Sequence, residues 1–256
     1  MIDPRAVIAA DVELGEGVEI GPFTVIGPGV RIGAGTRIGP HAVIHGPTTL
    51  GRDNRVFQFA SIGADPQDRK YCGEPTRLEI GERNVFREFC SINRGTAGGH
   101  GVTRIGDDCL FMAGAHVAHD CIVGNQCVLA NCTALGGHVE LGDWVILSGY
   151  SGVHQFCRVG VHAFLANNAA VTQDVPPYVL VAGAPAAPRS VNSEGLKRRG
   201  FDAEQITRIR HAYKLLYRSG LKLAAATERL TELATAQPEL RPLVEFIARS
   251  ERGLVR

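Results

Sequence analysis

Aliphatic residues return at every sixth position along most of this chain, and that period is the main signal of its fold. An amphipathic helix needs apolar residues every three to four positions and a half-buried strand every two, so a period of six fits neither. It is typical of a hexapeptide-repeat solenoid. Between residues 115 and 155 the series comprises Val117, Val123, Leu129, Leu135, Leu141, Leu147 and Val153.

The repeat extends far beyond this stretch. It starts at Ile2, breaks after Ile62 and returns in phase at Ile80; a second break shifts the phase by one residue, and the series then runs from Ile105 to Val171. Three hexads are expected to close one triangular coil with the aliphatic residues inside. Parallel coils stack roughly 4.8 Å apart. One coil cannot bury its own apolar face, so stability comes from the stack, and the sequence predicts a parallel β-helix.

Two segments interrupt the repeat and are expected to leave the coil as loops. The first, near residues 63–79, is rich in proline, glycine and charge, and the second, residues 93–104, is rich in glycine. Ordered loops on a rigid scaffold often carry function. Gln67, Asp68 and Lys70 in the first loop are therefore candidate binding residues, and a solvated charged loop is the alternative.

After paired prolines in QDVPPYV the period becomes helical. Asp202 and Gln205 form a capping box at the start of a helix, and Gly220 offers a stop. Further helices are expected over residues 222–236 and from 238 to about 249.

The chain therefore divides into a β-helix over residues 1–190 and an α-helical C-terminal domain over residues 191–256. The second unit is too small to bury a large core of its own and should pack on a neighbour.

Composition excludes several classes of protein. A net charge of +1 over 256 residues gives no reason to expect nucleic acid or an anionic membrane as a partner. No apolar run approaches the ~20 residues of a transmembrane segment, and the early start of the repeat leaves no room for a signal peptide. We therefore expect a cytoplasmic protein.

The seven cysteines are odd in number, and most fall at the fifth position of a hexad, a small inward-facing site. They are expected to be reduced core residues, not disulfides or metal ligands. The five at this position are Cys90, Cys109, Cys121, Cys127 and Cys157.

A group of polar residues lies on the same ladder. His119, Gly137 and Gln155 are separated by eighteen residues and should form one column, with Asp120 and His138 on the next. His119 and Gln155 would lie two coils apart, ~10 Å along the axis. Asp120 beside His119 suggests a dyad in which the carboxylate orients the imidazole; a row of polar surface residues is the alternative.

Clustered histidines also raise the possibility of a metal site. Zinc needs at least three ligand atoms within about 2.0–2.2 Å of one point. His116 and His119 are three residues apart on a hexad ladder and are not expected to share a face. No two histidines are five apart, the spacing found in β-helix zinc carbonic anhydrases. We expect no metal and no other cofactor.

Several segments, in order along almost the whole chain, resemble those of the UDP-N-acetylglucosamine O-acyltransferases, which begin lipid A synthesis in Gram-negative bacteria. The resemblance implies a left-handed β-helix and a homotrimer with active sites between neighbouring β-helices. It further implies that an acyl carrier protein donates a 3-hydroxyacyl group to the 3-hydroxyl of UDP-N-acetylglucosamine. The segments are QDRKYCGEPTRLEIG, INRGT, AHVAHDCIVGN, GGHVELGDW, VHQF, QDVPPYV and NSEGLKRRGF.

The same resemblance implies roles for individual residues. His119 matches the general base that takes the proton from the sugar hydroxyl, Asp120 its partner, and the backbone N–H of Gly137 the oxyanion donor. Two adjacent guanidinium groups, those of Arg198 and Arg199, suit a diphosphate, although a solvated basic turn would look the same. Substrate binding is implied for Asp68, Lys70, His116, His138, His154 and Gln155, and nucleotide binding for Asn192, Glu194, Arg198 and Arg199.

The chain departs from the family pattern at one position and carries a notable residue at another. Asn93 replaces the histidine that much of the family has in INRGT, and asparagine cannot titrate near neutral pH. Asn167 occupies the acyl-chain ruler position, where enzymes that use longer chains tend to carry glycine.

Two alternative functions remain open at this point. The related UDP-3-O-acylglucosamine N-acyltransferase carries an extra domain before its repeats, whereas here the hexads begin at residue 2. A non-catalytic β-solenoid would need no column of histidine and glutamine. The sequence leaves open the preferred acyl length and whether the acceptor is the ordinary sugar or its 3-amino analogue.

Overall fold

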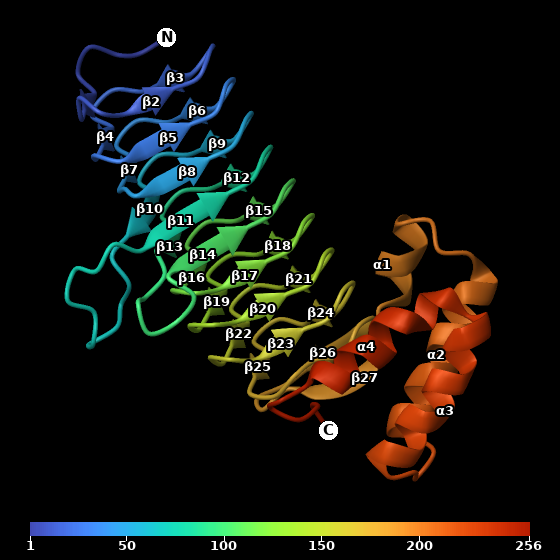
Figure 1. The fold of residues 1–256 in the computed structure, drawn as a ribbon. Coiled ribbons are helices and arrows are strands. Elements are labelled where there is room, and N and C mark those ends of the chain that lie inside the picture. Colours follow the sequence, from blue (N-terminus) through green and yellow to red (C-terminus); the bar gives the residue numbers. More distant parts are fainter.

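Short parallel strands, most of them two residues long, stack into the three sides of a β-helix, which a group of helices follows at its C-terminal end (Figure 1). The computed structural model describes all 256 residues. Up to β24, successive strands pass from the first sheet to the second and then to the third, so each of these coils contributes one strand to every sheet.

We number the sheets by the first strand that each contains. Sheet 1 consists of β1 (Val7–Ile8), β4 (Val25–Ile26), β7 (Val43–Ile44), β10 (Ser61–Ala64), β13 (Ser91–Asn93), β16 (His116–Val117), β19 (Ala134–Leu135), β22 (Gly152–Val153) and β25 (Ala170–Val171). Sheet 2 consists of β2 (Glu13–Leu14), β5 (Val30–Ile32), β8 (Thr48–Leu50), β11 (Arg77–Ile80), β14 (Val102–Ile105), β17 (Ile122–Val123), β20 (Glu140–Leu141) and β23 (Arg158–Val159). Sheet 3 consists of β3 (Glu19–Ile20), β6 (Arg37–Ile38), β9 (Arg55–Val56), β12 (Val85–Phe86), β15 (Leu110–Phe111), β18 (Val128–Leu129), β21 (Ile146–Leu147), β24 (Phe164–Leu165), β26 (Val179–Ala182) and β27 (Ala187–Val191).

The register confirms the eighteen-residue coil. Ile32 pairs with Leu50, Leu50 with Ile80 across the first loop, and Ile80 with Ile105 across the second. The first loop therefore adds twelve residues, two full hexads, and the second adds seven. Both loops leave a sheet 1 strand and enter sheet 2, so they project from the same edge of the β-helix (Figure 1).

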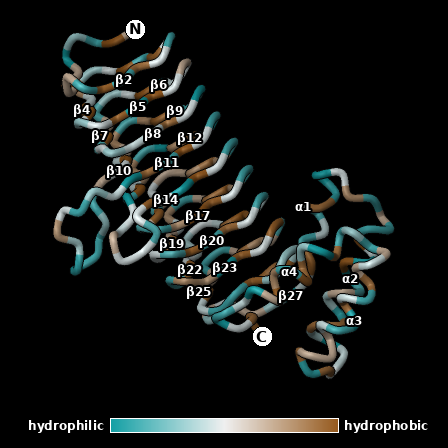
Figure 2. The backbone as a smooth tube through the Cα atoms, viewed as in Figure 1, coloured by the Kyte–Doolittle hydropathy of each residue, from teal (hydrophilic) through white to brown (hydrophobic).

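From Ile20 to Val171 the aliphatic member of each hexad points into the β-helix and is almost completely buried, and Phe86 and Phe111 take its place in two hexads. Apolar and polar segments alternate along every coil (Figure 2). All seven cysteines are free, and those at the fifth hexad position are buried as predicted, while Cys72 and Cys132 are exposed. Each buried thiol fills a corner of the core, so burying it removes apolar surface from water.

The helices follow the prediction closely. The capping box of Asp202 and Gln205 is present at the start of the longest helix. Two features were not predicted, the antiparallel pairing of β26 with β27 and the short helix that follows it. The helices are α1 (Ser193–Arg198), α2 (Ala203–Tyr217), α3 (Leu223–Ala236) and α4 (Arg241–Arg249), with a 3-10 turn at Pro238–Leu240.

The helical unit does pack on its neighbour. Its apolar cluster includes Tyr178 and Val191 from the end of the β-helix, and the C-terminal segment returns to pair Leu254 with Asp174. None of the helices combines the length and the apolar character that a membrane crossing requires.

Candidate active site

One edge of the β-helix, where the chain turns from sheet 1 into sheet 2, carries most of the candidate residues. We call this edge corner 1–2; it comprises residues 65–76, 94–101, 118–121, 136–139 and 154–157. The predicted columns form here, because the His138 N–H donates to the His119 carbonyl at 3.0 Å and the Phe156 N–H to the Gly137 carbonyl at 3.0 Å.

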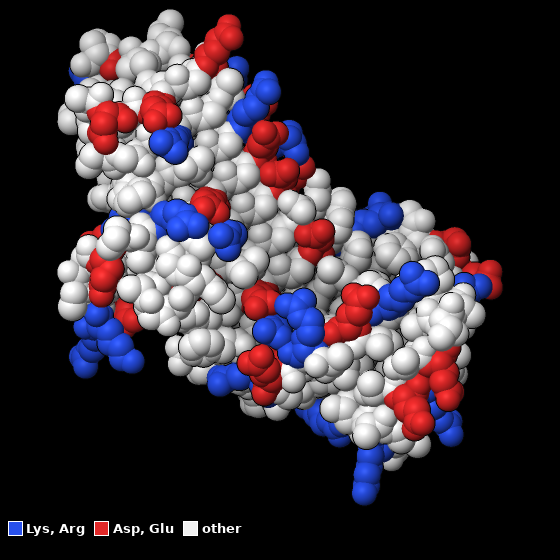
Figure 3. Space-filling view, in the orientation of Figure 1, with Lys and Arg blue, Asp and Glu red and all other residues white.

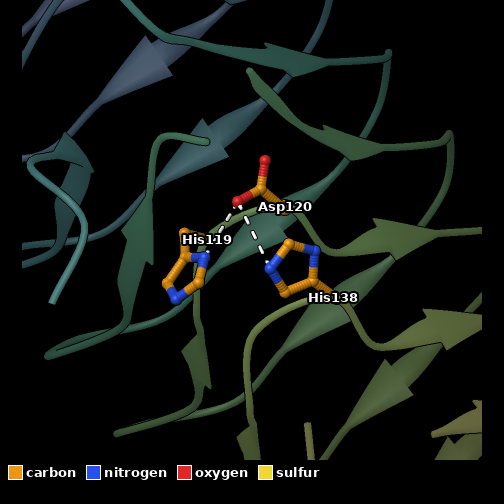
Figure 4. Close-up of side chains that lie close together, drawn as sticks. All are labelled: His119, Asp120 and His138. Carbon is orange, nitrogen blue, oxygen red and sulfur yellow. Dashed lines mark hydrogen bonds and ion pairs between the residues drawn. The ribbon is translucent and has the colours of Figure 1, made fainter. Parts of the chain in front are cut away.

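The adjacent residues His119 and Asp120 do form a dyad. Nδ1 of His119 lies 2.9 Å from Oδ2 of Asp120 (Figure 4). The carboxylate side chain is fully buried and the imidazole is 16% exposed. Asp120 adopts a left-handed backbone conformation, φ 59°, shared by His138 and Phe156 at the same position of the next two coils. The repeated turn thus presents one side chain per coil in the same orientation.

The carboxylate of Asp120 is held in its ionised form. Burial alone would raise the pKa of this carboxyl, but hydrogen bonds from Thr96 and His119 outweigh burial and hold the pKa below its usual range. An ionised carboxylate can only accept, so Nδ1 of His119 carries the proton and Nε2 is left as the basic nitrogen. This arrangement suits an imidazole that takes a proton from a substrate.

His138 completes the cluster from the next coil. Its Nε2 lies 3.8 Å from Oδ2 of Asp120, its ring meets that of His119 edge-on at 5.2 Å, and it stacks on Phe156 at 4.4 Å. Burial lowers the pKa of His138, with Asp120 acting in the opposite direction. The imidazole of His138 is therefore neutral near pH 7.

A groove runs along sheet 1 beside this cluster. Its floor is made by the small outward residues Ala134, Gly152 and Ala170, and both His116 and His119 line it. The expectation that these two histidines do not share a face is wrong, because an outward strand residue and the corner that follows it are neighbours around the coil. Other polar groups in the groove are Gln67, His154 and Gln155.

Gly137 lies directly against the imidazole of His119. A Cβ atom at this position would come within 2.6 Å of Cε1 and 2.8 Å of Nε2. Only glycine lets the coil approach so closely. The N–H of Gly137 makes no hydrogen bond within the chain, so it is available to a substrate.

Family models match segments in both parts of the chain. A family model described as "Udp N-acetylglucosamine O-acyltransferase; Domain 2" matches residues 174–255, and one for bacterial transferase hexapeptides matches three segments within residues 1–137. Proteins of Thiobacillus denitrificans and Stenotrophomonas maltophilia named acyl-[acyl-carrier-protein]--UDP-N-acetylglucosamine O-acyltransferase are 52% and 54% identical. Each match covers this whole chain and 99% and 97% of those proteins.

The chain belongs to the UDP-N-acetylglucosamine O-acyltransferase family.

Solved structures agree with this assignment. The Francisella novicida UDP-N-acetylglucosamine acyltransferase superposes with a TM-score of 0.98 at 43% identity, covering 100% of this chain and 94% of that one. The Arabidopsis enzyme gives 0.86 at 33% identity and full coverage of both chains. These likenesses confirm the predicted fold class, a left-handed parallel β-helix followed by a small helical domain.

Two of the three candidate residues in the first loop lie near the groove and the dyad. Gln67 lines the groove. Asp68 accepts a hydrogen bond from the Lys70 N–H at 3.0 Å, and it is close enough to His138 for its charge to act on that imidazole. Lys70 itself is exposed, so its side chain makes no contact that would fix it.

The candidate nucleotide residues lie elsewhere, where the chain turns from sheet 2 into sheet 3. Asn192 is buried; it accepts from the Gly195 N–H at the start of α1 and donates to the His162 carbonyl at 3.0 Å. Glu194 pairs with Lys197 at 2.9 Å. Within one chain, therefore, the candidate nucleotide-binding residues and the His119–Asp120 dyad lie on different edges of the β-helix.

The two adjacent arginines differ in environment. The guanidinium of Arg199 lies 4.9 Å from the centre of the Trp144 ring and 3.4 Å from Nδ1 of His162, whereas Arg198 is exposed. Burial lowers the pKa of Arg199, and stacking on the indole supplies a cation–π contact. The guanidinium of Arg199 is therefore held by its neighbours, whereas that of Arg198 is open to solvent.

The side chains around the dyad come closer to the arrangement of a metal site than the sequence suggested. His119, Asp120 and His138 place one ligand atom each within 4.8 Å of one another. Both oxygens of Asp120, however, already accept hydrogen bonds from N–H and O–H groups of Thr96, His100 and His119. The cluster therefore fits a hydrogen-bonded dyad better than a metal centre.

Sequence reasoning missed Thr96 and His100, which hold Asp120. A signal was present, since counting coils places the loop 94–101 on the same edge one coil before His119. The stacked rings of Trp144, His162 and Tyr178 were also missed; the eighteen-residue spacing of Trp144 and His162 could have revealed that pair, whereas Tyr178 follows His162 by only sixteen residues.

Proposed function

We propose that this protein transfers a 3-hydroxyacyl group from acyl carrier protein to the 3-hydroxyl of UDP-N-acetylglucosamine, the first step of lipid A biosynthesis, and acts in the cytoplasm. The observation that carries the proposal is the His119–Asp120 dyad facing an open groove. Full-length relatives named for this activity support it at 52–54% identity.

The geometry accounts for each step of the transfer. Nε2 of His119 takes the proton as the sugar oxygen attacks the thioester carbonyl, and the ionised Asp120 stabilises the resulting imidazolium. The negative charge that develops on the carbonyl oxygen accepts from the free N–H of Gly137. Collapse breaks the carbon–sulfur bond, and the imidazolium returns its proton to the leaving thiolate.

Substrate positioning falls to the polar residues around this pair. His116 and His138 are neutral because burial lowers the pKa of each, so both can donate to or accept from a hydroxyl. Nδ1 of His116 lies 2.8 Å from the hydroxyl of Ser91, which fixes the imidazole plane. The exposed residues His154, Gln155 and Lys70 and the half-buried Asp68 remain candidate contacts to the sugar and the acyl chain.

The distribution of surface residues supports a homotrimer. Sheet 2 turns charged pairs outward, such as Arg31 with Glu13 and Arg104 with Glu79, and Figure 3 shows charges of both signs across the visible face. Sheet 1 presents no Asp, Glu, Lys or Arg side chain outward. Its outward residues are Val7, Val25, Val43, Ser61, Ser91, His116, Ala134, Gly152 and Ala170.

Two further features border a subunit contact. Where sheet 3 turns into sheet 1, the rings of Phe23, His41, Phe59 and Phe89 stack at 5.1 to 5.4 Å, although the three phenylalanines are at least half exposed. The later strands of sheet 3 also present half-buried apolar residues. Two different apolar faces on one chain fit a heterologous contact that closes into a ring. The outward residues of these sheet 3 strands are Val85, Leu110, Val128, Ile146 and Phe164.

Such a ring would also complete the site. The nucleotide candidates and the dyad occupy different edges of one chain, so α1 of one subunit would meet corner 1–2 of the next. Arg198 is then free to reach a diphosphate, while Arg199 is held against Trp144.

The decisive experiment is mass spectrometry of the product made from UDP-N-acetylglucosamine, or its 3-amino analogue, with a mixture of acyl carrier proteins. A 3-O-hydroxyacyl sugar nucleotide supports the proposal. Transfer to the amine alone would make the analogue the acceptor, and absence of transfer from any donor would refute the function.

Docking of the acidic carrier should depend on α2. Arg210, Lys214 and Arg218 recur every four residues on its exposed side and have no ion-pair partner. We expect sedimentation to give a trimer and kcat/KM for the acyl carrier protein to fall with ionic strength, because complementary charge mainly raises the association rate.

Lys214→Glu should lower kcat/KM several-fold, whereas Arg52→Glu, the same charge change on the β-helix, should not. A monomer, or turnover indifferent to salt, would contradict this.

Chain-length preference should depend on Asn167. This residue is exposed in the turn between β24 and β25, the strand whose Ala170 lines the groove, and an amide there would be disfavoured against methylenes. Because each methylene that fits gains ~0.8 kcal/mol, we expect preference for donors of about ten to twelve carbons and a shift toward fourteen in Asn167→Gly. Competition between a ten-carbon and a fourteen-carbon donor measures this preference, and Asn168→Gly is the control variant. Equal use of the longer donor by wild type and variant alike would remove Asn167 from this role.

A further inference from the structure

The carboxylate of Asp120 is held almost entirely by the loop 94–101. The Thr96 N–H donates to both carboxylate oxygens at 3.0 and 3.1 Å, the Thr96 hydroxyl to Oδ2 at 2.6 Å, and the His100 N–H to Oδ1 at 2.8 Å. Gly99 covers the same group so closely that a Cβ atom there would lie 2.5 Å from Oδ2. Residues 96–100 of this loop therefore enclose the Asp120 carboxylate.

The start of the same segment holds the other loop. Arg94 is buried, and its guanidinium donates to the carbonyls of Gly63 at 2.7 Å and Gly46 at 3.0 Å. Nη2 of the same guanidinium donates to the Asp65 carboxylate and, at 3.0 Å, to the Tyr71 hydroxyl.

Asn93 adds to this contact. It is buried, and its amide donates to the Asp65 carbonyl at 2.9 Å. Asn93 thus helps to hold the loop 65–76, which carries Asp68 and Lys70.

We propose that residues 93–100 form a clamp in which Thr96 positions the Asp120 carboxylate and Arg94 positions the loop that carries Asp68 and Lys70. Neither residue needs to touch substrate, so both are positioning residues. The inference rests on the proposed acyl transfer. It extends that proposal by giving a positioning role to residues 93–100, which take no direct part in the reaction steps.

The two ends of the clamp should have different kinetic signatures. Thr96 acts through Asp120 on the imidazole that moves the proton, so it affects kcat. Arg94 acts through a loop that contacts the sugar, so it affects KM for the sugar nucleotide.

The first test compares Thr96→Val, which removes the hydroxyl and keeps shape and N–H, with Thr96→Ser, which keeps the hydroxyl. A hydrogen bond to a charged group is worth about 10- to 100-fold, so kcat should fall by that factor in Thr96→Val with KM nearly unchanged, and Thr96→Ser should recover most of it. Thr24→Val removes a buried hydroxyl far from the site that donates to the Gly39 carbonyl, and it should leave kcat unchanged.

A double-mutant cycle separates this role from general damage. In an Asp120→Asn background Thr96→Val should cost little further activity, because the group through which it acts is gone. Full additivity, a Thr96→Val enzyme within about twofold of wild type, or a serine variant no better than valine would overturn the first half of the proposal.

The second test uses Asp65→Ala, which removes one acceptor of Arg94 at the exposed end of the contact. KM for the sugar nucleotide should rise severalfold while kcat stays near wild type, and trypsin should cleave after the exposed Arg69 or Lys70 faster than in wild type. Unchanged proteolysis together with unchanged KM would overturn the second half. Proteolysis needs no turnover, so it reports on the clamp even if wild type fails to form the proposed product.

Discussion

Replacing His119 with alanine is expected to lower kcat by ~10² to 10⁴ and leave the fold intact, since that is the usual worth of a positioned general base. The imidazole lies at the groove surface with Nδ1 fixed by Asp120, so its loss removes the base without opening the core. Steady-state turnover with acyl carrier protein and UDP-N-acetylglucosamine measures the effect, and thermal unfolding checks the fold.

The matched control is His45→Ala, which removes an exposed histidine from an earlier coil of the β-helix. It should retain wild-type turnover. A His119→Ala enzyme within a few-fold of wild type would refute the general-base role, whatever the product analysis shows.

Gly137→Ala is expected to be nearly as damaging, for a different reason. The backbone of Gly137 is outside the left-handed region, so alanine fits the main chain, but its Cβ atom would come within 2.6 Å of the His119 ring. The ring must then turn away from Asp120 or from the groove. Misplacing a reacting group by about 1 Å can cost 10²-fold, and we expect a loss of at least that size in kcat.

Two comparisons isolate this effect. Gly149→Ala adds the same methyl group where the nearest atom is 3.6 Å away and should be close to neutral. In a His119→Ala background Gly137→Ala should cost little, because the clash has been removed. A large additional loss there would point to the oxyanion N–H instead, and an active Gly137→Ala single variant would contradict the geometry.

The periodic part of this molecule could be predicted, because a closed coil forces the chain to repeat. Once Ile32, Leu50 and Ile80 are known to stack, the columns of His119 with Gly137 and of Asp120 with His138 follow by counting. The loops could be located for the same reason, since they are where the count fails.

Counting coils places the loop 94–101 on the edge that carries His119, but the individual contacts of Thr96 with Asp120 and of Arg94 with Gly46 could not be predicted, because the conformation of the loop lies outside the repeat. The error over His116 and His119 came from treating the corner as a separate face, whereas it continues the strand before it. The helix α1 is only six residues long, too short for helical periodicity to show.

The eighteen-residue register also restricts how the length of this protein can change during evolution. Insertion of one hexad between Ile105 and His119 would turn every later residue by one side of the triangle, away from the groove. A whole extra coil would preserve every orientation and change only the distance along the axis. The two loops absorb twelve and seven additional residues without disturbing the pairing of Leu50, Ile80 and Ile105. A change of loop length would therefore leave the coils in register, and would be limited only by the contacts that Arg94, Thr96 and His100 make.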